Sequence, residues 1–452
     1  MSQKIKQIYE CSYCGAQSLK WSGRCLECGN WGTMKLQSYT DKEEKKQQAE
    51  QTAPAEIFEL KNIKQKGPDR METGIKEVDR VLGGGVVPGS LILLSGDPGI
   101  GKSTLTAQIG DGISRRNQKE IFYISGEESA GQVKQRLERL GCDPANIKFI
   151  SNTNVEKIIS SLKDKEPAFL IIDSIQTLYS SDNPSEPGSV SQIRCLASKF
   201  MEFAKENNAA VILIGHITKD GQLAGPKTLE HIVDTVLYLE SEATQKSYCL
   251  LRGTKNRFGS VNEVGVFEMT GNGFQEIANS SSIFLEDGNE NISGSVISCV
   301  MDGSKSFFVD VQALVTKTVF GYPQRKSSGL DVNRLQVLTS VLTKRTNFNL
   351  VNQDIVLNIV GGMKVADPAL DLSVCLAIVS SFVDKVIPRS TLVLGEVGLG
   401  GEIRNIAKPE LRLKEAERLG FDRAIVPKTK QKMSTNMDVK RVRNIKEAVG
   451  YL

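Results

Sequence analysis

This sequence of 452 residues lacks several features, and each absence excludes a class of protein. No run of apolar residues approaches the ~20 that a helix needs to cross a bilayer. The start of the chain is polar and lysine-bearing, unlike a secretory signal. Only two histidines are present, His216 and His231, so most histidine-based metal sites and catalytic triads are excluded. We therefore expect a cytoplasmic protein with no membrane partner.

The overall composition is that of a globular protein with a substantial core, because 40% of the residues are hydrophobic and 24% are charged. The length predicts about three domains. The formal net charge of +4 is mildly basic and does not by itself indicate a nucleic-acid partner. The function has to be inferred from motifs.

The nine cysteines are an odd number, which argues against a disulfide framework. Four of them lie close together, in the pattern Cys11-x2-Cys14-x10-Cys25-x2-Cys28. Each C-x-x-C pair can direct two thiolates at one ion, and two such pairs make a tetrahedral zinc site. A segment this small has no core, so zinc binding supplies its folding free energy. Residues 1–37 are therefore predicted to be a four-cysteine zinc knuckle.

The same segment carries three aromatic and three cationic residues: Tyr13, Trp21, Trp31, Lys20, Arg24 and Lys35. Such aromatics can stack nucleic-acid bases while the cations contact phosphates. They can equally cover the zinc knuckles, or the module can dock a protein. The sequence leaves the three roles open.

The rest of the chain divides by composition into a linker (38–62), a core (63–278), a second linker (279–292) and a last domain (293–452). Within the core, apolar runs alternate with helical patterns. Strands are expected at 91–96, 121–125, 169–173 and 211–215. Continuous apolar strands separated by helices predict an α/β domain with a mostly parallel sheet, covered on both faces.

Residues 96–103, Gly-Asp-Pro-Gly-Ile-Gly-Lys-Ser, fit the phosphate-binding pattern G-x-x-x-x-G-K-[ST]. Backbone N–H groups of such a loop surround phosphates, and the next helix directs its positive end at the same anion. Lys102 would reach the β- and γ-phosphates, and Ser103 would hold Mg²⁺. The predicted nucleotide contacts are Gly96, Asp97, Pro98, Gly99, Ile100, Gly101, Lys102, Ser103 and Thr104.

Carboxylates end two of the expected strands. Asp173 ends the strand 169–173, which in a parallel sheet finishes beside the phosphate loop, so we predict that Asp173 binds the magnesium shell through water. Glu127 and Glu128 follow the strand 121–125. One can orient or deprotonate the attacking water, and the other can be an acid at a helix N-terminus. We favour Glu127 as the catalytic base.

These motifs follow a lead-in formed by Thr73-Gly74, Asp79 and the run Leu-Gly-Gly-Gly-Val-Val-Pro-Gly at 82–89. Together they resemble the RecA superfamily. The resemblance implies a RecA-like P-loop core that hydrolyses ATP with Mg²⁺. In that superfamily the strand ending at Gly215 carries a polar sensor of the γ-phosphate, and here His216 occupies that place.

The pentapeptide Lys255-Asn256-Arg257-Phe258-Gly259 follows an apolar strand at 248–252. Composition alone predicts a solvated turn. A zinc knuckle, a RecA-type core, this motif and a C-terminal domain, in this order, resemble the bacterial RadA (Sms) family of DNA-repair proteins over essentially the whole chain. By analogy with hexameric helicases, Lys255 and Arg257 would enter a neighbouring subunit's nucleotide site as cationic fingers. A DNA contact is the competing role.

The resemblance implies a DNA-dependent ATPase, a helicase-type motor that promotes branch migration of RecA-made recombination intermediates. The implied partners are single-stranded and branched DNA, the recombinase RecA, and further copies of the chain in a homohexameric ring. The segments 179–192 and 219–227 would face DNA, and their Gly/Pro/Ser content predicts mobile loops. An ATP-gated scaffold that loads RecA without motor activity is an alternative.

Residues 293–452 resemble the Lon protease domain, an α/β fold of the ribosomal S5 domain 2 type. Ala369 stands where that family has its serine nucleophile, and Glu410 stands at the catalytic lysine's place. Neither can replace a member of a Ser–Lys dyad, so a Lon-like protease is disfavoured. Cations are frequent between 423 and 446. They can bind duplex DNA or form a solvated surface.

Overall fold

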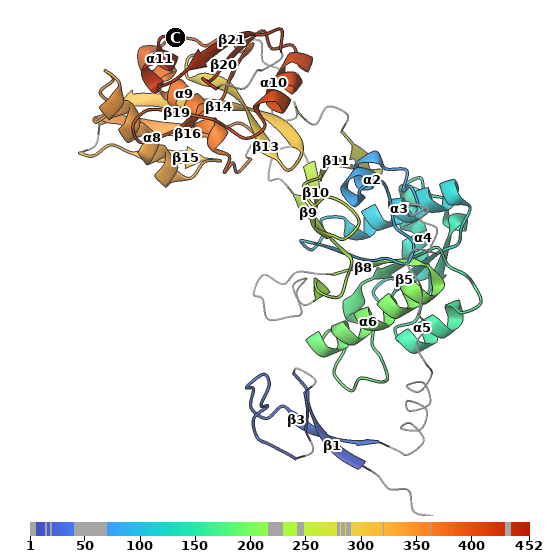
Figure 1. Ribbon diagram of the computed structural model, residues 1–452. Helices are drawn as coiled ribbons and strands as arrows, with labels where there is room; N and C mark the ends of the chain where they lie inside the picture. Colours follow the sequence, from blue (N-terminus) through green and yellow to red (C-terminus); the bar gives the residue numbers. More distant parts are fainter. Residues whose placement is uncertain are drawn as a thin grey trace, which may run out of the picture. The chain divides into compact units, whose positions relative to one another are not determined.

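A computed structural model of the chain (Figure 1) describes residues 6–13, 16–18, 20–39, 70–215, 229–241, 248–277, 281, 285, 291–319, 321–361, 363–429 and 435–452. Several predictions fall outside these residues: the zinc ligand Cys14, the sensor His216, the loop 219–227 and most of the linkers 38–62 and 279–292. The chain divides into two compact units, and the division falls among the strands that follow residue 240. No described helix is long and apolar enough to cross a membrane.

The N-terminal segment folds as a small antiparallel sheet in the order β2-β1-β3. Its strands are β1 (Lys6–Cys11), β2 (Gln17–Ser18) and β3 (Met34–Tyr39). The buried cluster inside it contains Cys11, Cys25 and Met34. So few apolar residues cannot stabilise a fold, which agrees with the expected dependence on a metal.

The described core residues form a nine-stranded sheet in the order β12-β11-β10-β9-β4-β8-β7-β5-β6. Every pairing from β9 through β4, β8, β7 and β5 to β6 is parallel. The strands are β4 (Leu91–Gly96), β5 (Ile121–Ser125), β6 (Ile147–Ile150), β7 (Phe169–Asp173), β8 (Ala210–Ile214), β9 (Thr235–Ser241), β10 (Tyr248–Asn256), β11 (Val264–Thr270) and β12 (Gly273–Glu276). The prediction of a mostly parallel α/β sheet is confirmed, and β8 begins one residue earlier than expected.

Helices cover both faces of this sheet. They are α2 (Lys76–Leu82), α3 (Lys102–Asn117), α4 (Ala130–Arg139), α5 (Val155–Leu162) and α6 (Val190–Asn207). Gly110 of α3 lies close to Ile121 and Ile171. The alternate strand residues, such as Phe122 and Leu170, share a cluster with α5 and α6. Because successive side chains of a strand point to opposite faces, α3 covers one face while α5 and α6 cover the other.

The C-terminal residues form a second sheet, in the order β15-β16-β14-β13-β17-β20-β21, with a small hairpin of β18 and β19. Its strands are β13 (Ser295–Asp302), β14 (Lys305–Lys317), β15 (Arg325–Ser328), β16 (Gln353–Ile359), β17 (Thr391–Val393), β18 (Glu396–Val397), β19 (Ile403–Arg404), β20 (Arg423–Pro427) and β21 (Asp438–Val442). The helices are α8 (Val332–Arg345), α9 (Asp371–Val383), α10 (Pro409–Arg418) and α11 (Ile445–Val449). Val296 and Phe307 pack toward α8 and α9, whereas Ile297 and Phe308 pack toward α10. This is the expected second α/β domain.

Candidate nucleotide and zinc sites

The phosphate loop lies between the end of β4 and the start of α3, and its glycines are required by the backbone path. Gly96, Gly99 and Gly101 have φ values of 152°, 78° and 102°, which L-residues with side chains rarely adopt. A Cβ on Gly96 would lie 2.3 Å from the carbonyl oxygen of Leu239 on β9. Residues 97–99 are exposed. An exposed turn of backbone at the N-terminus of α3 fits a triphosphate.

Lys102 is buried at the centre of this loop. Its Nζ donates hydrogen bonds to the carbonyl oxygens of Gly96 and Asp97, both at 2.9 Å. Burial lowers the pKa of Lys102, while the carboxylates of Asp173, Asp97 and Glu127 act in the opposite direction. The fold therefore brings the predicted lysine close to the predicted magnesium residue and the predicted base, although the three come from separate elements.

Asp173 ends β7 and is only 5% exposed. Its Oδ2 accepts a hydrogen bond from the hydroxyl of Tyr123 on β5, and Arg136 of α4 lies 3.9 Å from the same oxygen. Sequence reasoning missed Tyr123 and Arg136, because nothing local marks a tyrosine in an apolar strand or an arginine on a surface helix. Ser103 lies in the first turn of α3 and is partly buried. Hydroxyl and carboxylate oxygens at this edge are the ligand types that Mg²⁺ prefers.

The adjacent glutamates after β5 lie in different surroundings. Glu127 accepts a hydrogen bond of 2.5 Å from the hydroxyl of Ser174, directly after Asp173. Glu128 instead forms an ion pair with Arg136. A polar hollow of about 410 Å³ lies beside them and is lined by Ser125, Gly126, Glu127, Glu128, Ser129, Ser151, Asn152 and Thr153. Glu127 is thus the glutamate whose side chain contacts the residue that directly follows β7.

The predicted turn at 255–259 requires a correction, because β10 continues through Lys255 and Asn256. The extra length has a tertiary cause. The backbone N–H of Arg257 donates to the carbonyl of Asp234, and the side-chain amide of Asn256 lies within hydrogen-bond distance of the carbonyl of Leu82. Asp234 and Leu82 are both far from β10 in the sequence. The apolar run at 248–252 therefore predicted an end of the strand that is too early.

The motif also contacts the glycine run that precedes the phosphate loop. Arg70 donates from Nη1 to the carbonyl of Leu82 and from Nη2 to that of Phe258, at 3.0 and 2.6 Å. A Cβ on Gly259 would lie 3.2 Å from the Cα of Gly83. Two motifs more than 170 residues apart therefore form one structure at the C-terminus of α2.

The two cations of this motif have partners within their own chain. Lys255 Nζ donates to the carbonyls of Glu230 and Val233, at 2.5 and 2.8 Å. Arg257 forms an ion pair of 3.0 Å with Asp234, and its side chain is 52% exposed. Of the two, Arg257 presents the larger part of its side chain to solvent.

The cysteine segment gathers thiols as the spacing predicts. The Sγ atoms of Cys11, Cys25 and Cys28 lie within 4.8 Å of one another, and the first and last are 3.6 Å apart. Thiolates at such distances can share one tetrahedral zinc ion, so the described residues fit the metal. The fourth predicted ligand, Cys14, lies outside the described residues.

Comparison with known proteins finds matches in three parts of the chain. Family models match residues 9–35 (rubredoxin metal binding domain), 59–222 (AAA domain) and 331–430 (subunit ChlI of Mg-chelatase). The DNA repair protein RadA of Halalkalibacterium halodurans is 43% identical over 427 residues, covering 94% of this chain and 93% of that protein. The RadA protein of Listeria monocytogenes is 43% identical and covers 98% and 97%. The chain belongs to the RadA family of DNA repair proteins.

Among solved structures, a KaiC-like protein from Pyrococcus horikoshii is 21% identical, with a TM-score of 0.39, over 47% of this chain and 100% of that one. The RadB recombinase is 23% identical, with a TM-score of 0.37, over 46% of this chain and 99% of that one.

The family models and the RadA relatives establish the chemistry of the chain. It is an ATPase whose cofactors are ATP, Mg²⁺ and Zn²⁺.

The three aromatic residues that the sequence singled out in the RadA-family zinc segment are exposed: Tyr13 by 60%, Trp21 by 63% and Trp31 by 76%. A different aromatic residue, Tyr9, packs against the buried cluster that contains Cys11 and Cys25. Both indoles lie within 4 Å of the position of a Cβ on Gly23, so they flank the same glycine. Of the three roles that the sequence left open, covering the zinc knuckles is the one that this arrangement does not favour.

The predicted DNA-facing segment 179–192 makes several hydrogen bonds that its composition did not indicate. The buried Gln192 side chain donates to the carbonyl oxygens of residues 180, 183 and 185. Glu156 of α5 accepts from the hydroxyl of Ser180 and from Lys199 of α6. Partial burial raises the pKa of Glu156, but these hydrogen bonds prevail and lower it to about 2. Glu156 lies outside the Gly/Pro/Ser-rich stretch and Gln192 is its last residue, so composition gave no sign of these contacts.

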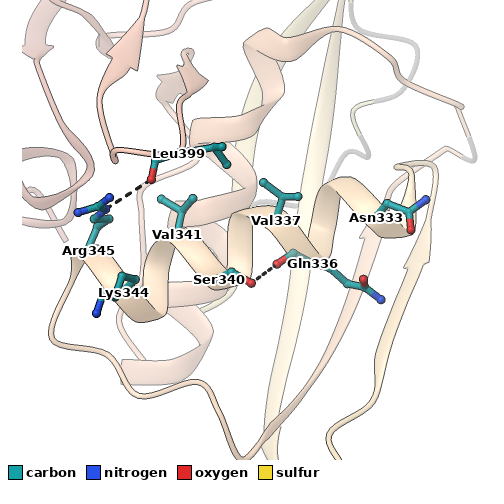
Figure 2. A pocket seen from close by; sticks show the side chains of 8 residues that line it. All are labelled: Asn333, Gln336, Val337, Ser340, Val341, Lys344, Arg345 and Leu399. Atoms are coloured by element: carbon teal, nitrogen blue, oxygen red, sulfur yellow. Dashed lines mark hydrogen bonds between the residues drawn. The ribbon is translucent and has the colours of Figure 1, made fainter.

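In the Lon-like part, Ala369 lies in a short 3₁₀ turn and is 1% exposed. Ser373, the nearest serine along α9, is buried and donates to the carbonyl of Leu370 at 2.7 Å. A groove of about 440 Å³ runs along α8 (Figure 2) and is lined by Asn333, Gln336, Val337, Ser340, Val341, Lys344, Arg345 and Leu399. Neither Ala369 nor Glu410 lines it, so this groove is separate from the degenerate dyad positions.

Proposed function

We propose that this chain is a DNA-dependent, helicase-type ATPase of recombinational repair that promotes branch migration of RecA-made intermediates. The observation that carries the proposal is that Lys102, Glu127 and Asp173 follow or end β4, β5 and β7, whose carboxyl ends lie at one edge of the parallel sheet. In a DNA-repair protein with this ATP site, the free energy of ATP hydrolysis can drive movement along DNA. Branch migration is such a movement.

Each site residue has a proposed role. Lys102 and the N–H groups of residues 96–104 bind the phosphates, and Lys102 neutralises charge on the transferred phosphoryl group. Ser103 would hold Mg²⁺ and Asp173 would bind its shell through water, and the ion would supply positive charge next to the phosphates. Glu127 orients the attacking water and accepts its proton. His216, outside the described residues, is proposed as the γ-phosphate sensor.

We further propose that nucleotide binds between subunits of a homohexameric ring and that Lys255 and Arg257 act on a neighbour's nucleotide. Arg257 is half exposed, which supports this role. Lys255 would first have to release the carbonyls of Glu230 and Val233. The proposed partners are single-stranded and branched DNA and RecA. The proposed domains remain 1–37, 63–278 and 293–452, joined by the linkers 38–62 and 279–292.

The test compares ATP hydrolysis with and without single-stranded DNA, together with strand displacement on a branched substrate. Single-stranded DNA should stimulate ATP hydrolysis by the wild-type protein, and the wild-type protein should displace the strand. Lys102→Ala should show neither DNA-stimulated hydrolysis nor strand displacement. ATP hydrolysis that ignores DNA, with no displacement, would favour the RecA-loading scaffold. Cleavage of casein that ATP stimulates and Lys102→Ala abolishes would instead favour the Lon-like protease.

A further inference from the structure

Behind the proposed magnesium residue Asp173 lies a chain of buried polar contacts that no motif predicted. We propose that Tyr123 and Arg136 are positioning residues that fix the carboxylate of Asp173 for Mg²⁺. The inference rests on the proposed role of Asp173 and adds residues to it that touch neither nucleotide nor metal.

Tyr123 is placed by its strand. Ser125, two residues further along β5, is the Cα partner of Asp173 on β7, so Tyr123 points to the same face as Ser125, behind the strand end. Its ring is fully buried and stacks with Phe149 of β6, with centroids 6.4 Å apart and planes at 21°. A buried tyrosine hydroxyl needs a hydrogen-bond partner, and here that partner is Asp173 Oδ2.

Arg136 sets the direction of this hydrogen bond. Its Nη1 lies 3.1 Å from the hydroxyl oxygen of Tyr123. A guanidinium can only donate, so the tyrosine oxygen accepts from Arg136 and its single proton is left for Asp173. The other nitrogen, Nη2, pairs with Glu128, which holds the guanidinium in place. The same cation lies 3.9 Å from Asp173 Oδ2 and compensates the charge of a nearly buried carboxylate.

As a result, the two oxygens of the Asp173 carboxylate have different surroundings. Oδ2 is engaged by Tyr123, while no described residue bonds Oδ1. A carboxylate anchored through one oxygen presents the other in a fixed direction toward the magnesium shell, and loss of contacts outside the metal's ligands typically weakens metal binding by about 10–100-fold. A purely structural cluster would also be buried and bonded, but its loss would not act selectively on the metal.

The experiment measures how Mg²⁺ changes the affinity of the full-length chain for a fluorescent ADP analogue. Tyr123→Phe removes one oxygen and keeps the ring. We expect its affinity in EDTA to match wild type and the Mg²⁺ concentration for the half-maximal effect to rise about tenfold. Arg136→Gln should shift the same quantity in the same direction. Tyr248→Phe, a buried tyrosine of β10, is the matched control and should behave as wild type.

Two results would overturn the inference. One is a magnesium requirement of Tyr123→Phe within about twofold of wild type, and the other is an equal loss of affinity in EDTA, which would mark a structural role. If Tyr123→Phe fails to fold, Arg136→Lys is tested by the same measurement. This variant keeps the positive charge but lacks the two guanidinium nitrogens that contact Tyr123 and Glu128. Asp173→Asn tests the proposed function separately from this inference. If this variant keeps the wild-type magnesium dependence, the proposed role of Asp173 itself is wrong.

Discussion

At the scale of single residues, Glu127 and Glu128 differ in what holds their carboxylates. Glu127 is bonded to Ser174 beside Asp173, and Glu128 is paired with Arg136. We expect Glu127→Gln to lower ATP turnover by ~10²-fold or more with little change in ATP affinity, because a positioned base contributes that much. Glu128→Gln should cost less, about tenfold at most, because Glu128 pairs with Arg136 and is not the proposed base, and saturating Mg²⁺ offsets weaker metal binding. Steady-state hydrolysis at saturating Mg²⁺ checks both, and the opposite ranking would contradict the assignment.

A second residue, Arg412 of α10, shows how burial decides the value of an ion pair. It is 1% exposed and bonds Asp367 at 2.6 Å. Arg412→Met removes the cation from that carboxylate and leaves it only the backbone N–H groups of Met301 and Ala369, so we expect the C-terminal unfolding transition to lose about 3–5 kcal/mol. Arg404, which pairs with Glu402 at the surface, is the matched control. Arg404→Met should leave the calorimetric midpoint nearly unchanged, and an equal effect of the two variants would refute the argument.

At the scale of elements, α3 approaches the lead-in motif so closely that one helical glycine cannot carry a side chain. A Cβ on Gly112 would lie 1.8 Å from the carbonyl oxygen of Thr73. Gly112→Ala therefore has to displace backbone, and we expect it to destabilise the ATPase core by about 1–3 kcal/mol.

Gly131 of α4 is the control for this prediction, since its Cβ would meet nothing closer than 4.0 Å. Gly131→Ala should stabilise the core by about 0.5–1 kcal/mol, the ordinary gain for alanine over glycine in a helix. Thermal unfolding followed by circular dichroism gives both values. A Gly112→Ala protein as stable as the Gly131→Ala protein would show that α3 can move away from Thr73 at no cost.

At the scale of the whole molecule, the zinc segment should fold or unfold by itself. Both tryptophans of the chain, Trp21 and Trp31, lie in it, so tryptophan anisotropy reports on this segment alone. Removal of zinc by a strong chelator should lower the anisotropy and leave the thermal transition of the ATPase core in place, because ligation supplies the folding free energy of so small a unit.

The matched variants for this prediction are Cys25→Ser and Cys195→Ser. The first removes one of the gathered thiols, and the second changes a cysteine of α6 that is far along the chain. Wild type and Cys195→Ser should bind about one zinc ion per chain, and Cys25→Ser should bind clearly less. Full zinc content in Cys25→Ser would remove it from the ligand set.

The sequence by itself determined the features whose signals are local. The apolar runs of β4, β5 and β7 and the glycines of residues 96–101 are readable in order, because burial on both faces and positive φ angles each demand particular residue types. The cysteine spacing works in the same way, since two turns suffice to direct four thiols at one ion.

Only the tertiary structure decided the contacts that join distant segments. It extended β10 through Asn256, joined Gly259 to Gly83, held the loop 179–192, and placed Tyr123 and Arg136 behind Asp173. Each depends on a hydrogen bond or close approach between residues that many positions separate. A linear pattern carries no information about such partners, because it is the packing of the sheet and its helices that brings them within reach.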